Sequence, residues 1–234
     1  MDPVETAVED RERDGPPDLP ALPMRLLWVL VSPGRLTERL AENPKWLGAL
    51  VVATVLVGIS MALIPPELFM EAQRQAMLER GGELPEVSAN AVNVMRFVIP
   101  AFTVLSTVVF TFVIAGLYTL IFAFILGDEG RYKQYLAVLS HSWFIAALFG
   151  LLVTPLRVST ENPQLTVNLA SFLLFLPDGY LLNVFRALDL SQIWSTLVFA
   201  QGAHAIDNRR SFGSAAAIGL TILLLFALIA ARFM

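Results

Sequence analysis

The sequence predicts an all-α integral membrane protein with five transmembrane helices and additional short interfacial or amphipathic helices. The 234 residues are 56% hydrophobic and only 15% charged, with a mean hydropathy of +0.66, whereas soluble domains usually carry about 25% charged residues. In addition, several uncharged runs approach the ~20 apolar residues that a helix needs to cross the hydrocarbon core. The five predicted spans cover residues 46–64, 97–126, 134–156, 190–206 and 212–231.

An acidic tail precedes the predicted membrane domain. Residues 1–20 hold seven acids and two arginines and are interrupted by Pro16, Pro17 and Pro20. This composition favours disorder, and it lacks the apolar core of a cleavable signal peptide. We therefore assign residues 1–20 to a disordered acidic tail and residues 21–234 to a single membrane domain.

A short charged helix is expected directly before the first span. The run MRLLWVLVS is too short to cross a bilayer and suits the membrane surface. A second helix then starts at Pro33, with Ser32 as its N-cap. Leu36 and Leu40 share one face of this helix, and its charged residues are placed for water. Asn43, which precedes a proline, is expected to end this helix and to cap the first span.

The remaining segments connect the spans. Residues 67–80 alternate charged and apolar side chains and predict an amphipathic helix outside the membrane, followed by a loop at residues 81–88. The short links at 127–133 and 207–210 hold neighbouring spans antiparallel. Residues 167–188 contain a short apolar run followed by charges, each of which costs about 2.5–3.5 kcal/mol at the centre of a membrane helix. This last segment is therefore expected to be interfacial or re-entrant rather than spanning.

The distribution of arginine and lysine predicts the orientation. With the N-terminus inside the cell, eight basic residues flank the spans on the cytoplasmic side and six on the other side. The positive-inside rule favours that arrangement, and the two tightest loops, GDEGRYK and DNRR, then also lie inside. The C-terminus is predicted to lie outside.

Three stretches of sequence resemble a known family. They are LVSPGRLTERLAENPKW before the first span, GRYKQYLAVLSHSW at the start of the third and LDLSQIWSTLVFAQGAHAI in the fourth. In their order along the chain they resemble the Yip domain family, membrane proteins that interact with Ypt/Rab GTPases, and in particular its bacterial branch. The likeness extends from Leu26 to Arg232.

The resemblance implies five spans, a cytosolic N-terminus and a short C-terminus on the far side, in agreement with the charge distribution. It also implies a multi-pass protein of a bacterial cytoplasmic membrane. Eukaryotic members carry an Asp-Leu-Tyr-Gly-Pro motif before the first span, where this chain has PDLPALP. The resemblance therefore does not extend to Rab binding.

Polar residues within the predicted spans are the first candidates for a functional site, because ionisable groups are costly in a bilayer. His141 lies in the third span, with Gln134 seven residues earlier on the same helix face, and His204 ends the fourth span three residues after Gln201. The two histidines could bind a metal or relay protons. A metal site takes three or four ligands, and no third ligand is assigned. We therefore favour hydrogen bonds between helices and predict neither a metal nor a cofactor.

Charged residues before the fourth span are the second group of candidates. Asp178 and Asp189 raise the alternative of an aspartyl intramembrane protease, whose chemistry needs two adjacent carboxylates. However, the run PDGY, which contains Asp178, is typical of a turn, and Asp189 stands where the fourth span needs an N-cap. Arg186 and Arg157 are the cations expected to lie near that cap. We predict no enzymatic activity and no catalytic residue.

A stripe of small residues in the second span has two interpretations. Its members lie four positions apart, at Thr103, Thr107, Thr111, Ala115 and Thr119. Such a stripe suits either a polar path for ions or the close packing of membrane helices. Packing is the favoured interpretation, here and for Ala215 and Gly219 in the fifth span.

The sequence contains no Gly-rich phosphate loop and no clustered basic patch, which argues against nucleic-acid binding. The expected partners are the lipid bilayer and proteins that bind the cytoplasmic N-terminal face, and a homo-oligomer is left open.

The resemblance leads to a non-enzymatic scaffold or adaptor that organises membrane or recruits partners. The alternative is a small transporter, channel or lipid-moving protein with a polar path between spans two, three and four. Continuous water access between those spans would favour the alternative. A dry bundle with an exposed N-terminal face would favour the adaptor.

Overall fold

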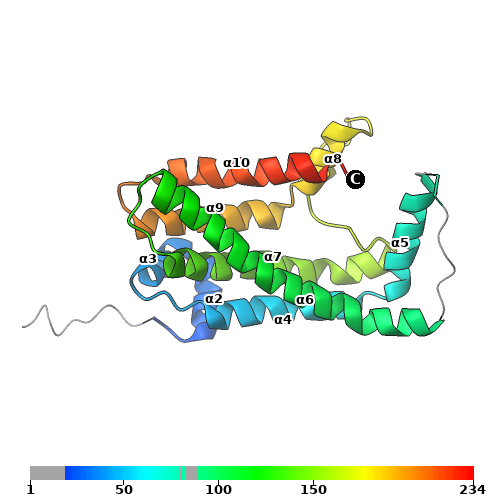
Figure 1. Cartoon of the computed structure of the whole chain (residues 1–234), viewed down its shortest axis with the longest axis horizontal. Helices are drawn as coiled ribbons and strands as arrows, with labels where there is room; N and C mark the ends of the chain where they lie inside the picture. Colours follow the sequence, from blue (N-terminus) through cyan, green and yellow to red (C-terminus); the bar gives the residue numbers. More distant parts are fainter. Residues whose placement is uncertain (1–18, 80, 83–88) are drawn as a thin grey trace, which may run out of the picture.

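The computed structural model describes residues 19–79, 81–82 and 89–234, and all of its regular elements are helical (Figure 1). The predicted all-α class is therefore confirmed, while most of the predicted tail and of the loop at 81–88 lies outside the described residues. The helices are α2 (Leu22–Val31), α3 (Pro33–Glu42), α4 (Leu47–Leu63), α5 (Pro66–Glu79), α6 (Ala89–Thr119), the π-helical turn η1 (Leu120–Ile125), α7 (Tyr132–Ser159), the 3-10 turn η2 (Leu169–Phe172), α8 (Tyr180–Ala187), α9 (Leu190–Ile206) and α10 (Phe212–Ala230).

The long helices run side by side in one bundle with α7 near its centre. Helix α7 packs against α4, α6 and α9, and α10 packs against α9. Helices α2 and α3 lie across one end of the bundle, while α5 and α8 lie at the opposite end (Figure 1). We refer to these as the α3 end and the α8 end. Helix α3 packs on α9 and α7.

Three helices are long and apolar enough to cross a membrane: α6 continued by η1, α7 and α10. The pair α4 and α5, bent by 77°, makes a fourth candidate if it is counted as one broken span. The predicted spans at 46–64 and 190–206 correspond to α4 and α9, which have 17 residues each. At 1.5 Å per residue such a helix covers about 26 Å, slightly less than the ~30 Å hydrocarbon core. The count of five spans is therefore not confirmed and stays a prediction.

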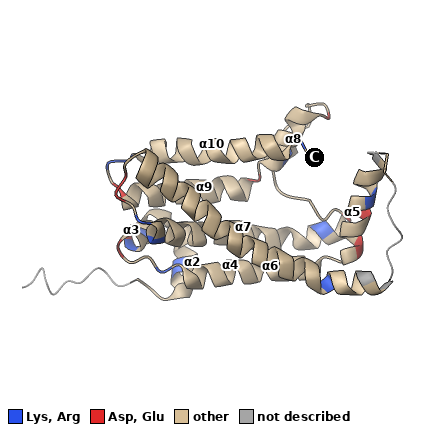
Figure 2. Ribbon diagram, in the orientation of Figure 1, with Lys and Arg blue, Asp and Glu red and all other residues tan. Residues whose placement is uncertain are grey.

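Charged residues gather at the two ends of the bundle and leave an uncharged band between them (Figure 2). Large apolar side chains point outward within this band, such as Val55 on α4, Leu105 on α6 and Leu225 on α10, each more than half exposed. In water such an exposed apolar surface would promote aggregation. Against lipid it is the expected surface of a membrane helix.

The tightest packing lies toward the α3 end. Fully buried side chains there come from the short helices as well as from the long ones, including Val29, Leu36, Leu40, Tyr135 and Phe199. Helix α3 thus buries the face that its sequence pattern predicted. A second, smaller core joins α8 to the end of α10 through Val184, Leu188, Ala227 and Ala231.

Two details of the N-terminal helices differ from the sequence prediction. Ser32 does precede Pro33 at the N-cap position, but its side chain makes no capping hydrogen bond. Asn43 ends α3, yet α4 begins only at Leu47, after Trp46. The physical reason is that a residue before proline favours an extended backbone, and three residues, 44–46, follow Asn43 before α4 begins.

The segment at 167–188 forms η2 and the eight-residue α8, neither of which is long enough to span a bilayer. This agrees with the expectation that it does not cross the membrane as a regular span. Its tip carries strongly exposed apolar side chains, at Phe172, Leu174 and Phe175. Exposed aromatic and aliphatic side chains beside a membrane helix suit the bilayer interface.

The two small-residue stripes, on α6 and α10, have different surroundings. The hydroxyls of Thr103, Thr107 and Thr111 donate to the carbonyl oxygens four residues earlier in α6, so they are satisfied within their own helix. On α10, Ala215 is fully buried, and a Cβ at Gly219 would lie 2.8 Å from the side chain of Thr196 on α9. Helices α9 and α10 therefore approach more closely than larger residues would allow.

Candidate functional site

The seven polar residues singled out in the sequence separate into three places. Gln134, Gln201 and His204 lie at the α3 end, and Arg157, Arg186 and Asp189 lie at the α8 end. His141 is buried in the bundle between them. The structure therefore does not bring the seven together into one site, because they sit on helices that run the length of the bundle.

Gln134 fastens α3 to the start of α7. Its side-chain oxygen accepts the backbone N–H of Arg131 at 2.7 Å, which caps α7, and its amide nitrogen donates to the carbonyl oxygen of Ala41 at 2.6 Å. Gln201 lies against the other end of α3, where its amide nitrogen is 3.6 Å from the position of a Cβ on Gly34. The two glutamines thus position the N-terminal helix rather than His141.

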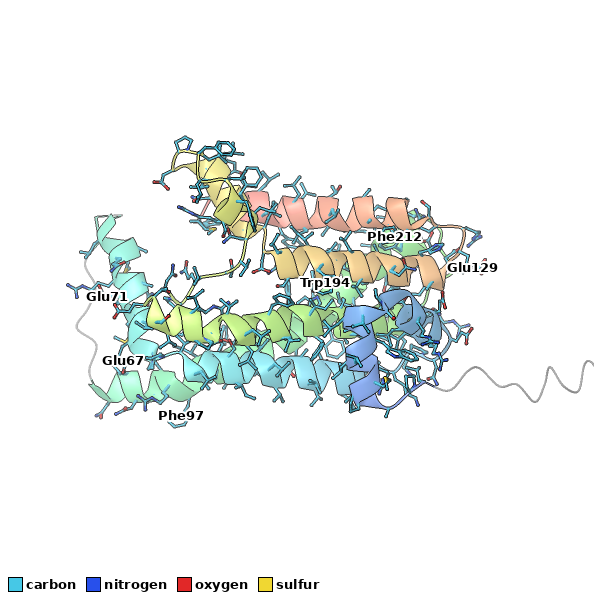
Figure 3. All side chains as sticks on the ribbon, turned by 180° about the vertical axis from the view of Figure 1, so that it is seen from behind. Glu67, Glu71, Phe97, Glu129, Trp194 and Phe212 are labelled. Carbon is cyan, nitrogen blue, oxygen red and sulfur yellow. The ribbon has the colours of Figure 1, made fainter. Side chains whose placement is uncertain are left out.

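A pair of short loops closes the α3 end through ion pairs. Arg210 holds the carboxylate of Asp128 through two hydrogen bonds of 2.6 Å, and both side chains are largely buried. Asp207 accepts hydrogen bonds from the guanidinium of Arg209 at 2.7 Å and from the backbone N–H of Glu129 at 3.0 Å. The loop between η1 and α7 is thereby tied to the loop between α9 and α10. Figure 3 shows Glu129 at this end and Glu67 and Glu71 at the other.

The charged forms of these groups are stabilised by their partners. The hydrogen bond from Arg209, with that from the Glu129 backbone, lowers the pKa of Asp207 well below its usual range. The Asp128 carboxylate raises the pKa of Arg210. His204 contributes through its ring, whose Nδ1 lies 2.6 Å from the carbonyl oxygen of Arg210. His204 therefore supports the loop through one of its two ring nitrogens.

Sequence reasoning treated these loops only as connections and missed the ion pairs between them. A signal was present, because GDEGRYK and DNRR are short, each contains both acidic and basic residues, and both were predicted on one side of the membrane. The pairing between individual residues could not be predicted, since four charged residues in one loop and three in the other allow several combinations.

Aromatic rings fill the space beneath the ion pairs. Tyr118 stacks on Phe199 with ring centroids 3.9 Å apart, and Phe122 stacks on Tyr135 at 5.8 Å. The guanidinium of Arg210 lies 5.7 Å from the centre of the Phe122 ring. Phe122 belongs to the π-helical turn η1, and π-helical turns are common near functional sites. Together with the ion pairs, these rings close the α3 end of the bundle.

His141 is 1% exposed, and its Nδ1 lies 2.8 Å from the carbonyl oxygen of Ala137 in its own helix. Its Nε2 is buried without a hydrogen-bond partner, as is Nε of Arg25 on α2. Arg25 also donates to the carbonyl oxygen of Lys45 at 3.3 Å. In the part of the chain that the structure describes, no three histidine, aspartate or glutamate side chains lie together as metal ligands.

Asp189 caps α9, as predicted. Its carboxylate accepts the backbone N–H groups of Ser191 at 2.7 Å and Gln192 at 3.3 Å, and also the hydroxyl of Ser191. Of the two cations expected beside it, Arg157 is close enough to interact electrostatically. Arg186 instead pairs with Asp178 at 3.1 Å on the surface.

A lateral groove that sequence reasoning did not identify lies along the middle of the bundle and extends toward the α8 end. A cavity of about 380 Å³ lies between α6, α7, α9 and α10. Two smaller cavities, of about 240 and 190 Å³, adjoin it toward the α8 end, and Arg157 lines both. Only the tertiary structure forms this groove, because its walls come from four helices far apart in the sequence.

The comparisons with known proteins agree with the helical architecture. A family model described as Yip1 domain matches residues 28–232, which is nearly the whole chain. No curated protein and no solved structure matches the chain. The match begins within α2 and ends just beyond α10, so it includes the last four residues of α2 and all of α3 as well as the bundle. The chain is a multi-pass membrane protein and belongs to the Yip1 domain family.

Proposed function

We propose that this protein is a non-enzymatic membrane adaptor that recruits partner proteins through the outward face of α3. The observation that carries the proposal is the way α3 is held. Leu36 and Leu40 are fully buried and Thr37 is 1% exposed, while Arg35 and Glu38 on the opposite face are exposed. A charged helix fixed on a rigid support is a suitable recognition surface, because little conformational entropy is lost when it binds.

The surrounding contacts support a rigid presentation of this face. Gln134 fastens the carbonyl oxygen of Ala41 to α7. The guanidinium of Arg35 lies 5.0 Å from the centre of the Trp28 ring, and that of Arg39 lies 5.3 Å from it. These cation–π contacts connect α3 to α2. The two N-terminal helices thus form one docked unit, and the Yip1 match covers α3 and the end of α2.

Our proposal places this face in the cytoplasm of a bacterial cell, with the C-terminus on the outer side of the cytoplasmic membrane. The support is the positive-inside rule: Arg35, Arg39, Lys45 and the basic residues of both ion-paired loops gather at the α3 end. Cytoplasmic and periplasmic reporters fused after Met234 test the orientation. Activity of the cytoplasmic reporter alone would contradict it.

Recruitment is tested by charge reversal on α3. The doubly substituted protein Arg35→Glu/Glu38→Lys should lose proteins that co-purify with the parent from native membranes, as identified by mass spectrometry. The matched control is Glu71→Lys/Arg74→Glu, an exposed i, i+3 ion pair on α5 at the opposite end, which should retain them. Loss in the control alone, or no difference between the two proteins, would argue against α3 as the docking face.

The alternative function, a small transporter, channel or lipid-moving protein, requires a polar path between α6, α7 and α9. Fewer observations support this alternative than support the adaptor. The threonine hydroxyls of α6 are bonded within their helix, and ion pairs and stacked rings close the α3 end. Reconstituted vesicles would reveal such an activity as solute or lipid flux above that of empty vesicles.

A further inference from the structure

The groove between α6, α7, α9 and α10 has apolar walls and faces the uncharged band of the bundle. Phe110 on α6 approaches Trp143 on α7 at 5.6 Å and Phe226 on α10 at 6.4 Å between ring centroids. These rings line the largest part of the groove. A groove of this kind within the uncharged band accommodates a hydrocarbon chain, since an unfilled groove would lose the dispersion contacts that the chain makes with its walls.

The groove continues along α7 toward the α8 end. The cavity of about 380 Å³ shares Trp143 and Ala146 with the cavity of about 240 Å³, and Ala146 and Gln192 with the cavity of about 190 Å³. Both smaller cavities are lined by Arg157. Arg157 stands two residues before the end of α7, and a charged side chain near the end of a membrane helix suits the depth of the lipid headgroups. From Arg157 to Ala146 is about 16 Å along the helix, roughly half of the ~30 Å hydrocarbon thickness.

Arg157 is a cation without a carboxylate in ion-pair contact among the residues that the structure describes. It is 9% exposed, and its Nε donates to the carbonyl oxygen of Leu165 at 2.8 Å. Asp189 lies across the cavity, but its carboxylate already accepts the N–H groups that begin α9. A buried cation is costly unless an anion compensates it. The guanidinium therefore has the capacity to hold a further anionic group.

Gln192 adds a second polar group at the junction of the cavities. Its side chain is exposed and lines both the cavity of about 380 Å³ and that of about 190 Å³. Across the described part of the chain, its side-chain amide makes no hydrogen bond. An amide at the headgroup depth, open to a groove, suits the ester and phosphate oxygens of a lipid.

We infer that the groove binds one anionic phospholipid from the leaflet at the α8 end. The phosphate lies against Arg157, the ester region against Gln192, and one acyl chain follows α7 past Ala146 to the rings around Trp143. The charge of Arg157 selects an anionic headgroup, and the apolar walls select a hydrocarbon chain. This inference is independent of the adaptor function, which concerns the opposite end of the molecule.

Quenching of Trp143 fluorescence by brominated acyl chains tests the inference. The protein would keep Trp143 as its only tryptophan, with the other three replaced by phenylalanine, and would be reconstituted with increasing mole fractions of brominated phosphatidylglycerol. We expect saturable quenching at a low mole fraction, and weaker, non-saturable quenching with brominated phosphatidylcholine. Equal quenching by the two lipids would overturn the inference.

Variants separate the site from the general lipid surface. Arg157→Gln should raise the mole fraction of phosphatidylglycerol at half-quenching roughly tenfold, the size expected for a charge-assisted hydrogen bond, and Arg157→Lys should raise it less. Arg186→Gln, which removes another arginine of the same end outside the groove, should leave it unchanged. An unchanged value for Arg157→Gln, or an equal change for Arg186→Gln, would contradict the inference.

A second measurement covers the case in which Arg157→Gln does not fold. Native mass spectrometry of the chain with all tryptophans present should show one bound phosphatidylglycerol after removal of excess lipid, and Gln192→Leu should reduce its occupancy several-fold. Gln192 is exposed at the groove, so this substitution leaves the packed core intact. If the Gln192→Leu protein retains as much bound phosphatidylglycerol as the parent, the lipid does not bind in the groove.

Discussion

Arg210 holds Asp128 through two parallel hydrogen bonds of 2.6 Å, and in doing so joins two loops that are 82 residues apart in the sequence. The side chains are 14% and 6% exposed. This pair fixes the position of η1 relative to α10 and closes the α3 end, on which the N-terminal helices rest. A bidentate arginine pair of this kind is more directional than a lysine pair.

The first prediction concerns this ion pair. Arg210→Leu leaves the Asp128 carboxylate buried without a partner and should lower the free energy of unfolding by about 3–5 kcal/mol. Arg210→Lys should cost less, because the charge remains while one hydrogen bond is lost. The measurement is unfolding in detergent. As a control, Arg186→Gln breaks the exposed pair with Asp178 and should cost no more than ~1 kcal/mol; similar losses in both proteins would contradict a special role for Arg210.

The second prediction is a dependence of stability on acid pH. Hydrogen bonds from Arg209 and from the Glu129 backbone lower the folded pKa of Asp207 below its usual value of 3.8. This contribution is therefore fully present above the unfolded pKa and is lost as the pH falls from about 4 toward the lower folded pKa. Melting temperatures measured from pH 7 to pH 3 should fall less steeply for Asp207→Asn than for the parent. Parallel curves for the two proteins would refute the assignment.

The third prediction concerns the cap of α9. Asp189→Asn should be mild because asparagine also caps helices, whereas Asp189→Leu loses the cap, which alone costs about 0.5–2 kcal/mol. The loss is larger if Arg157 is then left without its nearby negative charge. Thermal stability in detergent distinguishes the two variants. Equal stability of Asp189→Leu and the parent would show that the cap contributes nothing.

The fourth prediction concerns the crossing of α7 and α9. A Cβ at Gly202 would collide with the side chain of Val138, so Gly202→Ala should destabilise the protein despite the higher helix propensity of alanine. Gly116→Ala in α6 is the matched control, because its Cβ would meet nothing within 4 Å. That control should be neutral or stabilising by up to about 1 kcal/mol. A Gly202→Ala protein as stable as the control would mean that the two helices can separate without cost.

Much of this architecture could be predicted from the sequence because it depends on local patterns. Uncharged runs marked the long helices, the spacing of Leu36 and Leu40 predicted the buried face of α3, and the position of Asp189 before an apolar run predicted its cap. These signals depend on burial periodicity and on backbone groups a few residues away. The residues near each helix in the sequence are therefore enough to predict the helix, its buried face and its cap.

The start of α4 and the groupings of distant residues were decided by the tertiary structure. The pairing of Asp128 with Arg210, the contact of Gln134 with Ala41 and the separation of His141 from the other polar candidates depend on which helices meet and at what rotation. Hydropathy alone leaves that rotation open in a membrane helix, since lipid and protein interior are similarly apolar. The groove at Arg157 is formed only when α6, α7, α9 and α10 come together. The sequence by itself therefore determined the class of the protein and its elements, while helix packing decided which side chains could act together.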